Sequence, residues 1–174
     1  MSGRAGRWAL AVAVAVAAGG LGAACGEDVG MQPTMTGAQA AVRVEELLQE
    51  TFRQLPPGAR LRPYGGAGTL PCDDPTDGGP PGRVFVEQQY EVAHDPSWPV
   101  DEALPRLASH WEQRGYEVVK DLRAERDPQL AVEHPDGFRV GIEVYRRADG
   151  SADVYLVGSS VCVWEQGTPE APEV

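Results

Sequence analysis

Alternation of apolar and polar residues in the C-terminal half of the chain constrains the fold most. Between Phe138 and Val144, within the strand candidate 138–147, apolar residues occupy every second position. Because successive side chains of a β-strand point to opposite faces, this pattern predicts a strand with one buried face. Turn residues, Pro135-Asp136-Gly137 and Asp149-Gly150, stand at two joints between strand candidates. Antiparallel β-structure is therefore predicted, with strands over 116–122, 129–134, 138–147 and 152–164.

Two helices are predicted in the N-terminal part of the chain. Apolar residues at helical spacing run from Thr36, a good N-cap, to Leu55, and Pro56-Pro57-Gly58 ends the pattern. A second stripe predicts a helix over 101–114, with Pro105 close to its start and Gly115 as its stop. Two further strand candidates span 59–64 and 83–92, and the segment 65–82 is too rich in Gly, Pro and Asp for a regular element.

The order of these elements predicts an α+β fold. The first helix is followed by two strands and then by the second helix, and four more strands follow. We expect an antiparallel β-sheet of about five or six strands with both helices packed on one face. The predicted single domain spans 37–165, and 166–174 is expected to be a disordered C-terminal tail.

The first 24 residues have the pattern of a secretory signal peptide. Arg4 and Arg7 precede an uncharged apolar run, Trp8–Ala18, and small residues follow. The run is shorter than the roughly 20 apolar residues that a spanning helix needs, so it does not predict a permanent membrane helix. We therefore expect export and cleavage.

Cys25 lies where the signal peptide would be cleaved. The run LGAAC resembles a bacterial lipobox, in which the cysteine receives a diacylglycerol and becomes the mature N-terminus. This chain departs from the pattern, because Leu21 stands one position too far upstream and Gly22 occupies its place. The alternative is ordinary cleavage after Ala24, which would release a free secreted protein. The lipobox reading predicts a lipid on Cys25 and a flexible tether over 25–36.

The chain has three cysteines, and in an oxidising compartment an odd number leaves one thiol without a disulfide partner. If Cys25 is acylated, Cys72 and Cys162 remain and can pair in only one way. The closed loop would hold about 90 residues, for which the chain-entropy model gives roughly 4–5 kcal/mol. The alternative is two separate buried thiols, which is the less common state outside the cytoplasm.

The mature chain is strongly acidic. The leader holds two of the 15 basic residues and none of the 26 acidic ones, so the formal charge of the remainder is −13. Such a surface repels phosphate backbones and anionic lipid headgroups, which argues against nucleic-acid binding. It favours basic partners or cations, although solubility alone also explains it.

The loop CDDPTDGG carries the strongest suggestion of metal chemistry. Asp73, Asp74 and Asp77 offer carboxylate oxygens of the kind that calcium prefers. Their spacing is not that of a helix-loop-helix calcium motif, and Asp and Gly are also ordinary turn residues. The three histidines, His94, His110 and His134, have no partner at metal-ligand spacing, and no cofactor is predicted.

No catalytic motif was found in the sequence. Gly158-Ser159-Ser160 lacks the last glycine of a nucleophile elbow, and Gly65-Gly66-Ala67-Gly68 lacks the lysine of a phosphate-binding loop. Function in spatial sites escapes motif searches, so an enzyme stays open as an alternative. Several aromatic residues are candidates for a groove that takes sugars or a peptide: Trp98, Trp164, Tyr64, Tyr90, Tyr116 and Tyr155.

Several segments resemble a group of small actinobacterial lipoproteins of unassigned activity. They are LPPGARL, PCDDPTDGGPPGRVF, HWEQRGYEVV, VEHPDGFRVGIEV and SSVCVW, which together reach from Leu55 to Trp164. The resemblance implies a lipid on Cys25 and a bridge between Cys72 and Cys162, and it implies no catalytic residue.

The sequence thus predicts an exported lipoprotein on the extracytoplasmic face of the cell membrane. Its domain is expected to be a non-enzymatic binding or interaction module for an envelope protein or small ligand. Two alternatives stay open: an envelope hydrolase with an unrecognised site, and a calcium-dependent module built on the Asp73 loop.

Overall fold

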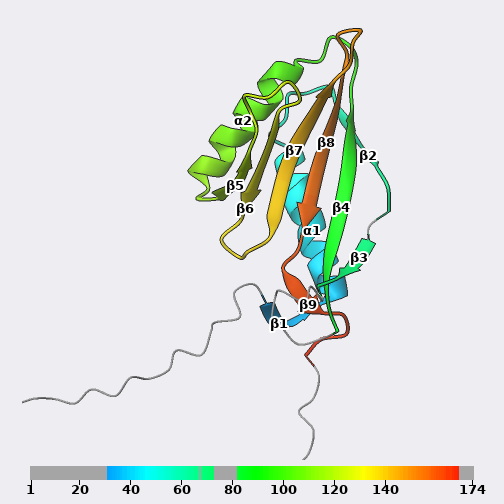
Figure 1. Ribbon diagram of the computed structural model, residues 1–174, viewed down its shortest axis with the longest axis vertical. Helices are drawn as coiled ribbons and strands as arrows, with labels where there is room; N and C mark the ends of the chain where they lie inside the picture. Colours follow the sequence, from blue (N-terminus) through cyan, green and yellow to red (C-terminus); the bar gives the residue numbers. More distant parts are fainter. Residues whose placement is uncertain (1–30, 67, 73–81, 169–174) are drawn as a thin grey trace, which may run out of the picture.

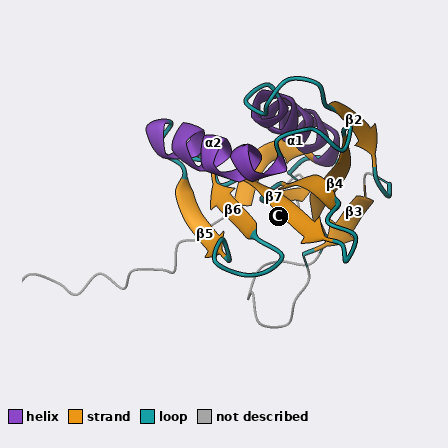
Figure 2. Ribbon diagram, turned by 90° about the horizontal axis from the view of Figure 1, so that it is seen from above, coloured by secondary structure: helices purple, strands orange, loops and turns teal. Residues whose placement is uncertain are grey.

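A mixed β-sheet runs through the protein, and both helices lie on one of its faces (Figures 1 and 2). The computed structural model describes residues 31–66, 68–72 and 82–168. Within these residues the sheet has nine strands. In chain order the elements are β1 (Met31–Thr36), α1 (Gly37–Phe52), β2 (Arg60–Pro63), β3 (Gly68–Pro71), β4 (Arg83–Ala93), α2 (Val100–Gln113), β5 (Glu117–Asp121), β6 (Gln129–Glu133), β7 (Arg139–Arg146), β8 (Ala152–Ser159) and β9 (Cys162–Trp164).

The α+β class is confirmed, but the expected sheet of five or six antiparallel strands is wrong in two respects. The sheet has nine strands among the described residues, and β1 pairs with β9 in parallel. Part of the expected tether, residues 31–36, forms β1, and part of the loop 65–82 forms β3. Neither segment shows a period of its own. The conformation of β3 depends on pairing with β4, and that of β1 depends on pairing with β9.

Strand β4 pairs with four of the other strands. It has 11 residues, and it pairs along one edge with β8 and β9 and along the other with β2 and β3. Val84 shows both edges in use, because it pairs with Pro71 of β3 and with Val163 of β9. The meander β5–β6–β7–β8 then extends the sheet from β8 by antiparallel pairing.

A bulge at Ser160 divides the strand that the sequence predicts over 152–164. Glu87 pairs with Ser159, and Val84 pairs with Val163, so the second strand carries one more residue than β4 between these two pairs. The Ser160 hydroxyl accepts a hydrogen bond from Val86 N–H at 2.9 Å, and Ser160 N–H donates to Val86 O at 2.9 Å. The bulge thus keeps its backbone groups paired while it bends the strand.

Helix α1 begins and packs as its sequence predicts. Thr36 forms a capping box with Gln39, in which each side chain accepts a hydrogen bond from the other residue's backbone N–H. The stripe Ala40, Val44, Leu47, Leu48 and Thr51 is buried against the sheet. Helix α2 also matches its prediction, although Pro105 lies in the second turn rather than at the start. Its position removes one N–H from the helix ladder.

Helix α1 approaches the sheet closely at Gly158 of β8. A Cβ added there would lie 3.0 Å from both Leu48 Cγ and Val44 Cγ1. Leu48 is fully buried, as are Leu156 of β8 and Ile142 of β7. The absence of a side chain at Gly158 therefore sets the distance between α1 and the centre of the sheet.

We predict that Gly158→Ala lowers the free energy of unfolding by about 2 kcal/mol, since the added methyl group forces α1 away from β8. Gly68→Ala is the matched control, because Gly68 lies in β3 with no atom within 4 Å of the added Cβ. Its effect is expected to stay within about 0.5 kcal/mol. Urea denaturation followed by circular dichroism measures both, and equal stability of the two variants would contradict this packing.

The predicted bridge between Cys72 and Cys162 is present, with their Cα atoms 6.0 Å apart. Cys72 follows β3, and its N–H donates to Arg83 O at 2.9 Å, whereas Cys162 begins β9. Because β3 and β9 lie on opposite edges of β4, the bridge crosses β4 and fastens both of its partners at one end of the sheet.

We predict that replacing both cysteines, Cys72→Ala with Cys162→Ala, costs 2–5 kcal/mol of stability, the range typical of small secreted domains. Mass spectrometry of the exported protein without reductant should show the pair oxidised, and thermal melts should show the loss. Two free thiols in the exported protein would refute the bridge.

Candidate functional site

Several predicted site residues lie outside the described part of the chain. These are Cys25, the three carboxylates Asp73, Asp74 and Asp77, the signal peptide 1–24, the tether over 25–30 and the tail over 169–174. Of the predicted tail, Gln166–Thr168 is described and forms a turn after β9. The lipid and calcium readings therefore stay predictions.

The three histidines lie apart from one another. His94 stacks on Trp98, with ring centroids 4.8 Å apart, and His110 Nε2 lies 3.7 Å from a carboxylate oxygen of Glu50. His134 contacts Asp136 in the turn between β6 and β7. The described residues contain no group of three or more His, Cys, Asp or Glu side chains placed to hold a metal ion.

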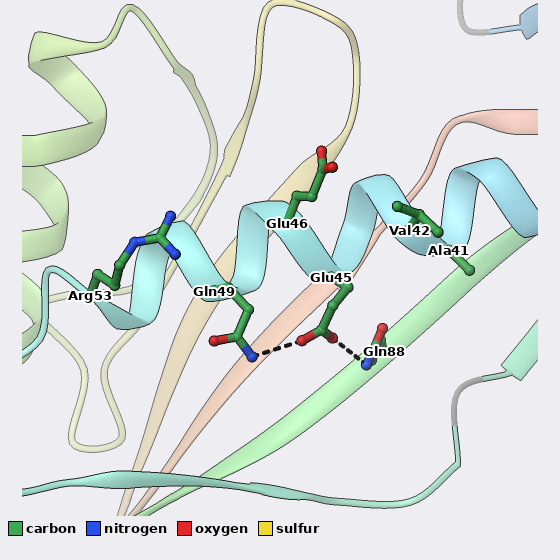
Figure 3. Close-up of a pocket in the computed structure, with 7 residues that line it drawn as sticks. All are labelled: Ala41, Val42, Glu45, Glu46, Gln49, Arg53 and Gln88. Carbon is green, nitrogen blue, oxygen red and sulfur yellow. Dashed lines mark hydrogen bonds between the residues drawn. The ribbon is translucent and has the colours of Figure 1, made fainter.

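A shallow groove of about 500 Å³ runs along the flank of α1 beside β4 (Figure 3). We call it the α1 groove. Ala41 and Val42 lie at one end and Arg53 at the other, and Glu45 and Gln49 point between them toward Gln88 (Figure 3). The lining residues are Ala41, Val42, Glu45, Glu46, Gln49, Arg53 and Gln88. The volume is in the range of small-molecule sites.

The Glu45 carboxylate occupies the floor of this groove. Its Oε1 accepts a hydrogen bond from Gln49 Nε2 at 2.7 Å. Its Oε2 accepts one from Gln88 Nε2 and one from the Tyr90 hydroxyl, both at 2.7 Å. Burial raises the pKa of Tyr90, and the hydrogen bond to Glu45 adds to the rise, so the hydroxyl stays protonated and donating. Two residues of β4 thus orient a carboxylate of α1.

Two of the three charged residues that line the groove, Glu45 and Arg53, have no ion-pair partner in the described chain. The three donors to Glu45 are neutral, and no described Lys, Arg or His forms an ion pair with it. Arg53 is the C-cap residue of α1, and it has neither an ion pair nor a side-chain hydrogen bond within the described residues. Glu46 also lines the groove, but it pairs with Arg43 at 3.4 Å. The groove therefore presents one unpaired negative charge and one unpaired positive charge to a ligand.

Sequence reasoning missed Glu45, although a signal was present. Glu45 falls between the buried stripe of α1 and the face that carries Arg43 and Glu46. On β4, Gln88 stands on the same face as Val86 and Tyr90, where an amide interrupts an apolar face. A polar residue at such a position predicts a polar partner across the packing interface. That partner is Glu45.

The opposite face of the sheet carries a row of three tyrosines. The ring of Tyr155 on β8 lies 4.7 Å from that of Tyr64 and 5.9 Å from that of Tyr145. The Tyr145 hydroxyl donates to Glu143 at 2.8 Å, and this bond raises the pKa of Tyr145 to about 12. Of the other predicted aromatic residues, Trp98 is buried and donates to Pro56 O, and Tyr116 is buried. Trp98 therefore lines no groove for sugars or a peptide, whereas Tyr116 borders a smaller pocket of about 290 Å³ between α2 and the strands β5 and β6.

Comparison with protein-family models, with curated proteins and with solved structures finds no match to this chain. No helix among the described residues is both long enough and apolar enough to span a membrane.

A second ionisable cluster joins α1 to the turn between β6 and β7. Asp136 Oδ2 accepts from Arg43 Nε at 3.0 Å and from Arg43 Nη2 at 2.9 Å. Arg43 Nη2 also lies 3.4 Å from His134 Nε2. An arginine can only donate, so Nε2 is the acceptor in this contact. His134 Nδ1 accepts from the Asp136 backbone N–H at 3.2 Å and also contacts Asp136 Oδ1. The members satisfy one another, which indicates a structural role.

Burial opposes ionisation of Asp136, but hydrogen bonds from Arg43, His134 and Phe138 N–H outweigh it and hold the pKa of Asp136 below its ordinary 3.8. A carboxyl with a lowered pKa stabilises the fold above its unfolded-state pKa, and this contribution disappears as the pH falls through the lower folded-state pKa.

We predict that Asp136→Asn lowers the free energy of unfolding by about 1 kcal/mol at pH 7. The gap from the wild type should close as the pH falls below 3.8. Glu46→Gln is the control, since Glu46 contacts the same arginine at 3.4 Å from a more exposed position, and it should cost close to nothing. Urea denaturation from pH 7 to pH 3 measures both variants. A gap that does not change with pH would contradict the assignment.

Proposed function

We propose that the protein is an exported lipoprotein whose domain is a non-enzymatic binding module of the cell envelope. The α1 groove is the binding site in this proposal. The observation that carries it is the Glu45 carboxylate, which three neutral donors orient at the floor of the groove without a cation. Unpaired charge at a half-buried position lowers stability unless a ligand uses it, so such a group favours a binding role.

The lining of the groove supports binding rather than nucleophilic catalysis. Apolar, amide, carboxylate and guanidinium groups line it, and these lining residues include no Ser, Thr, Cys or His to form the nucleophile–base pair of a serine or cysteine hydrolase. The resemblance to small actinobacterial lipoproteins supports the lipid anchor on Cys25 and implies no catalytic residue.

Anchoring through Cys25 would hold the domain close to the bilayer. Met31 already pairs with Cys162 of β9, so six Cα–Cα steps separate the acylated residue from the sheet, a reach of about 20 Å. The end of the sheet that carries β1, β9 and the disulfide would then face the membrane (Figure 1).

We predict that Cys25→Ala moves the protein from the membrane fraction to the medium, or leaves its leader uncleaved, and abolishes labelling by radioactive fatty acid. Gly22→Leu is the matched control. It places a leucine at the usual lipobox position and should leave the protein labelled and membrane-bound. Equal membrane retention of the wild type and Cys25→Ala would overturn the lipoprotein proposal.

A further inference from the structure

We propose that the α1 groove binds a short free peptide, with the N-terminal ammonium at Glu45 and the C-terminal carboxylate at Arg53. This inference rests on the proposed binding function and names the chemical class of its ligand. It follows from the two unpaired charges of the groove, Glu45 and Arg53, and from the distance between them. It also follows from the apolar side chains beside Glu45, those of Ala41 and Val42.

Glu45 is suited to hold an ammonium group. A carboxylate offers about four acceptor positions on its two oxygens. Three are occupied, one on Oε1 and two on Oε2, so Oε1 keeps room for a further donor. The bound amides and hydroxyl fix the carboxylate without cancelling its charge. An arriving ammonium thus meets an oriented partner and forms a charge-assisted hydrogen bond.

Arg53 is suited to hold a carboxylate at the other end. Its guanidinium presents donors in a planar fork that matches the two oxygens of a carboxylate. The described residues provide it with no acceptor. As the C-cap of α1 it follows the helix, so its backbone position is fixed relative to Glu45.

The distance between the two charges sets the length of the ligand. Glu45 and Arg53 are eight residues apart along α1, which corresponds to about 12 Å of helix axis. An extended peptide covers about 3.3–3.6 Å per residue, so a tripeptide places its terminal charges about 10 Å apart. With the reach of the two side chains, three residues fit the groove.

The apolar residues beyond Glu45 indicate which N-terminal residue of a peptide the groove prefers. Ala41 and Val42 lie on the side of Glu45 away from Arg53 (Figure 3), and Val42 is 61% exposed. An apolar side chain on the first residue would cover Val42, which buries apolar surface of both partners. A zwitterion also carries no net charge, so the acidic surface of the protein does not repel it.

The test is calorimetric titration of the mature exported protein with Leu-Ala-Ala, with its N-acetylated form and with its C-amidated form. The wild type should bind the free peptide, and each cap should weaken binding about tenfold or more. Acetylation should cost nothing further in Glu45→Gln, and amidation should cost nothing further in Arg53→Gln.

Glu102→Gln and Arg106→Gln are the matched controls, because these residues form an exposed pair on α2, away from the groove. Both should bind the three peptides as the wild type does. The inference is overturned if the free peptide gives no heat at millimolar concentration, if the caps do not matter, or if only acetylation matters, which would indicate a simple amine ligand. Membrane fractionation of Cys25→Ala tests the anchor separately, so either proposal can fail alone.

Discussion

The pairing of β4 on both edges is the constraint on which the rest of the structure depends. Eleven consecutive residues of this strand hold four other strands. Its apolar face, with Val86 and Val92, packs under α1, and its edges bring together segments that are distant in the sequence. The disulfide fastens the two partners at one end, where the paired segments are shortest. Short strands such as β3 and β9 exist because β4 gives them a template.

The candidate site is a consequence of the same arrangement. Gly158 lets α1 settle closely over β8, which leaves the flank of the helix beside β4 as an open groove. Gln88 and Tyr90, on the helix-facing side of β4, then meet Glu45 at hydrogen-bonding distance. A polar contact in the packing layer is favourable only when its members are satisfied, and these neutral donors satisfy it while leaving the charge available.

The sequence predicts both helices well, because Thr36, the Pro56-Pro57-Gly58 stop and the apolar stripe of α1 act locally. The sequence also predicts the strands in which apolar and polar residues alternate clearly, such as β7. The number of strands was underestimated, because β1 and β3 owe their conformation to pairing with β9 and β4 rather than to a pattern of their own. The role of Glu45 is not predicted by the sequence, for a related reason. Its role depends on contact with Gln88 of β4, which lies 43 residues away in the sequence.

The most direct test of the account is a nuclear magnetic resonance titration of the mature protein with Leu-Ala-Ala. The side-chain amide signals of Gln49 and Gln88 report on the Glu45 carboxylate, since both donate to it. The indole signal of Trp98 is the internal reference, because its N–H is buried in a bond to Pro56. The account predicts that both glutamine signals shift with saturation while the Trp98 signal does not. Unchanged glutamine signals, or shifts spread equally over the protein, would contradict it.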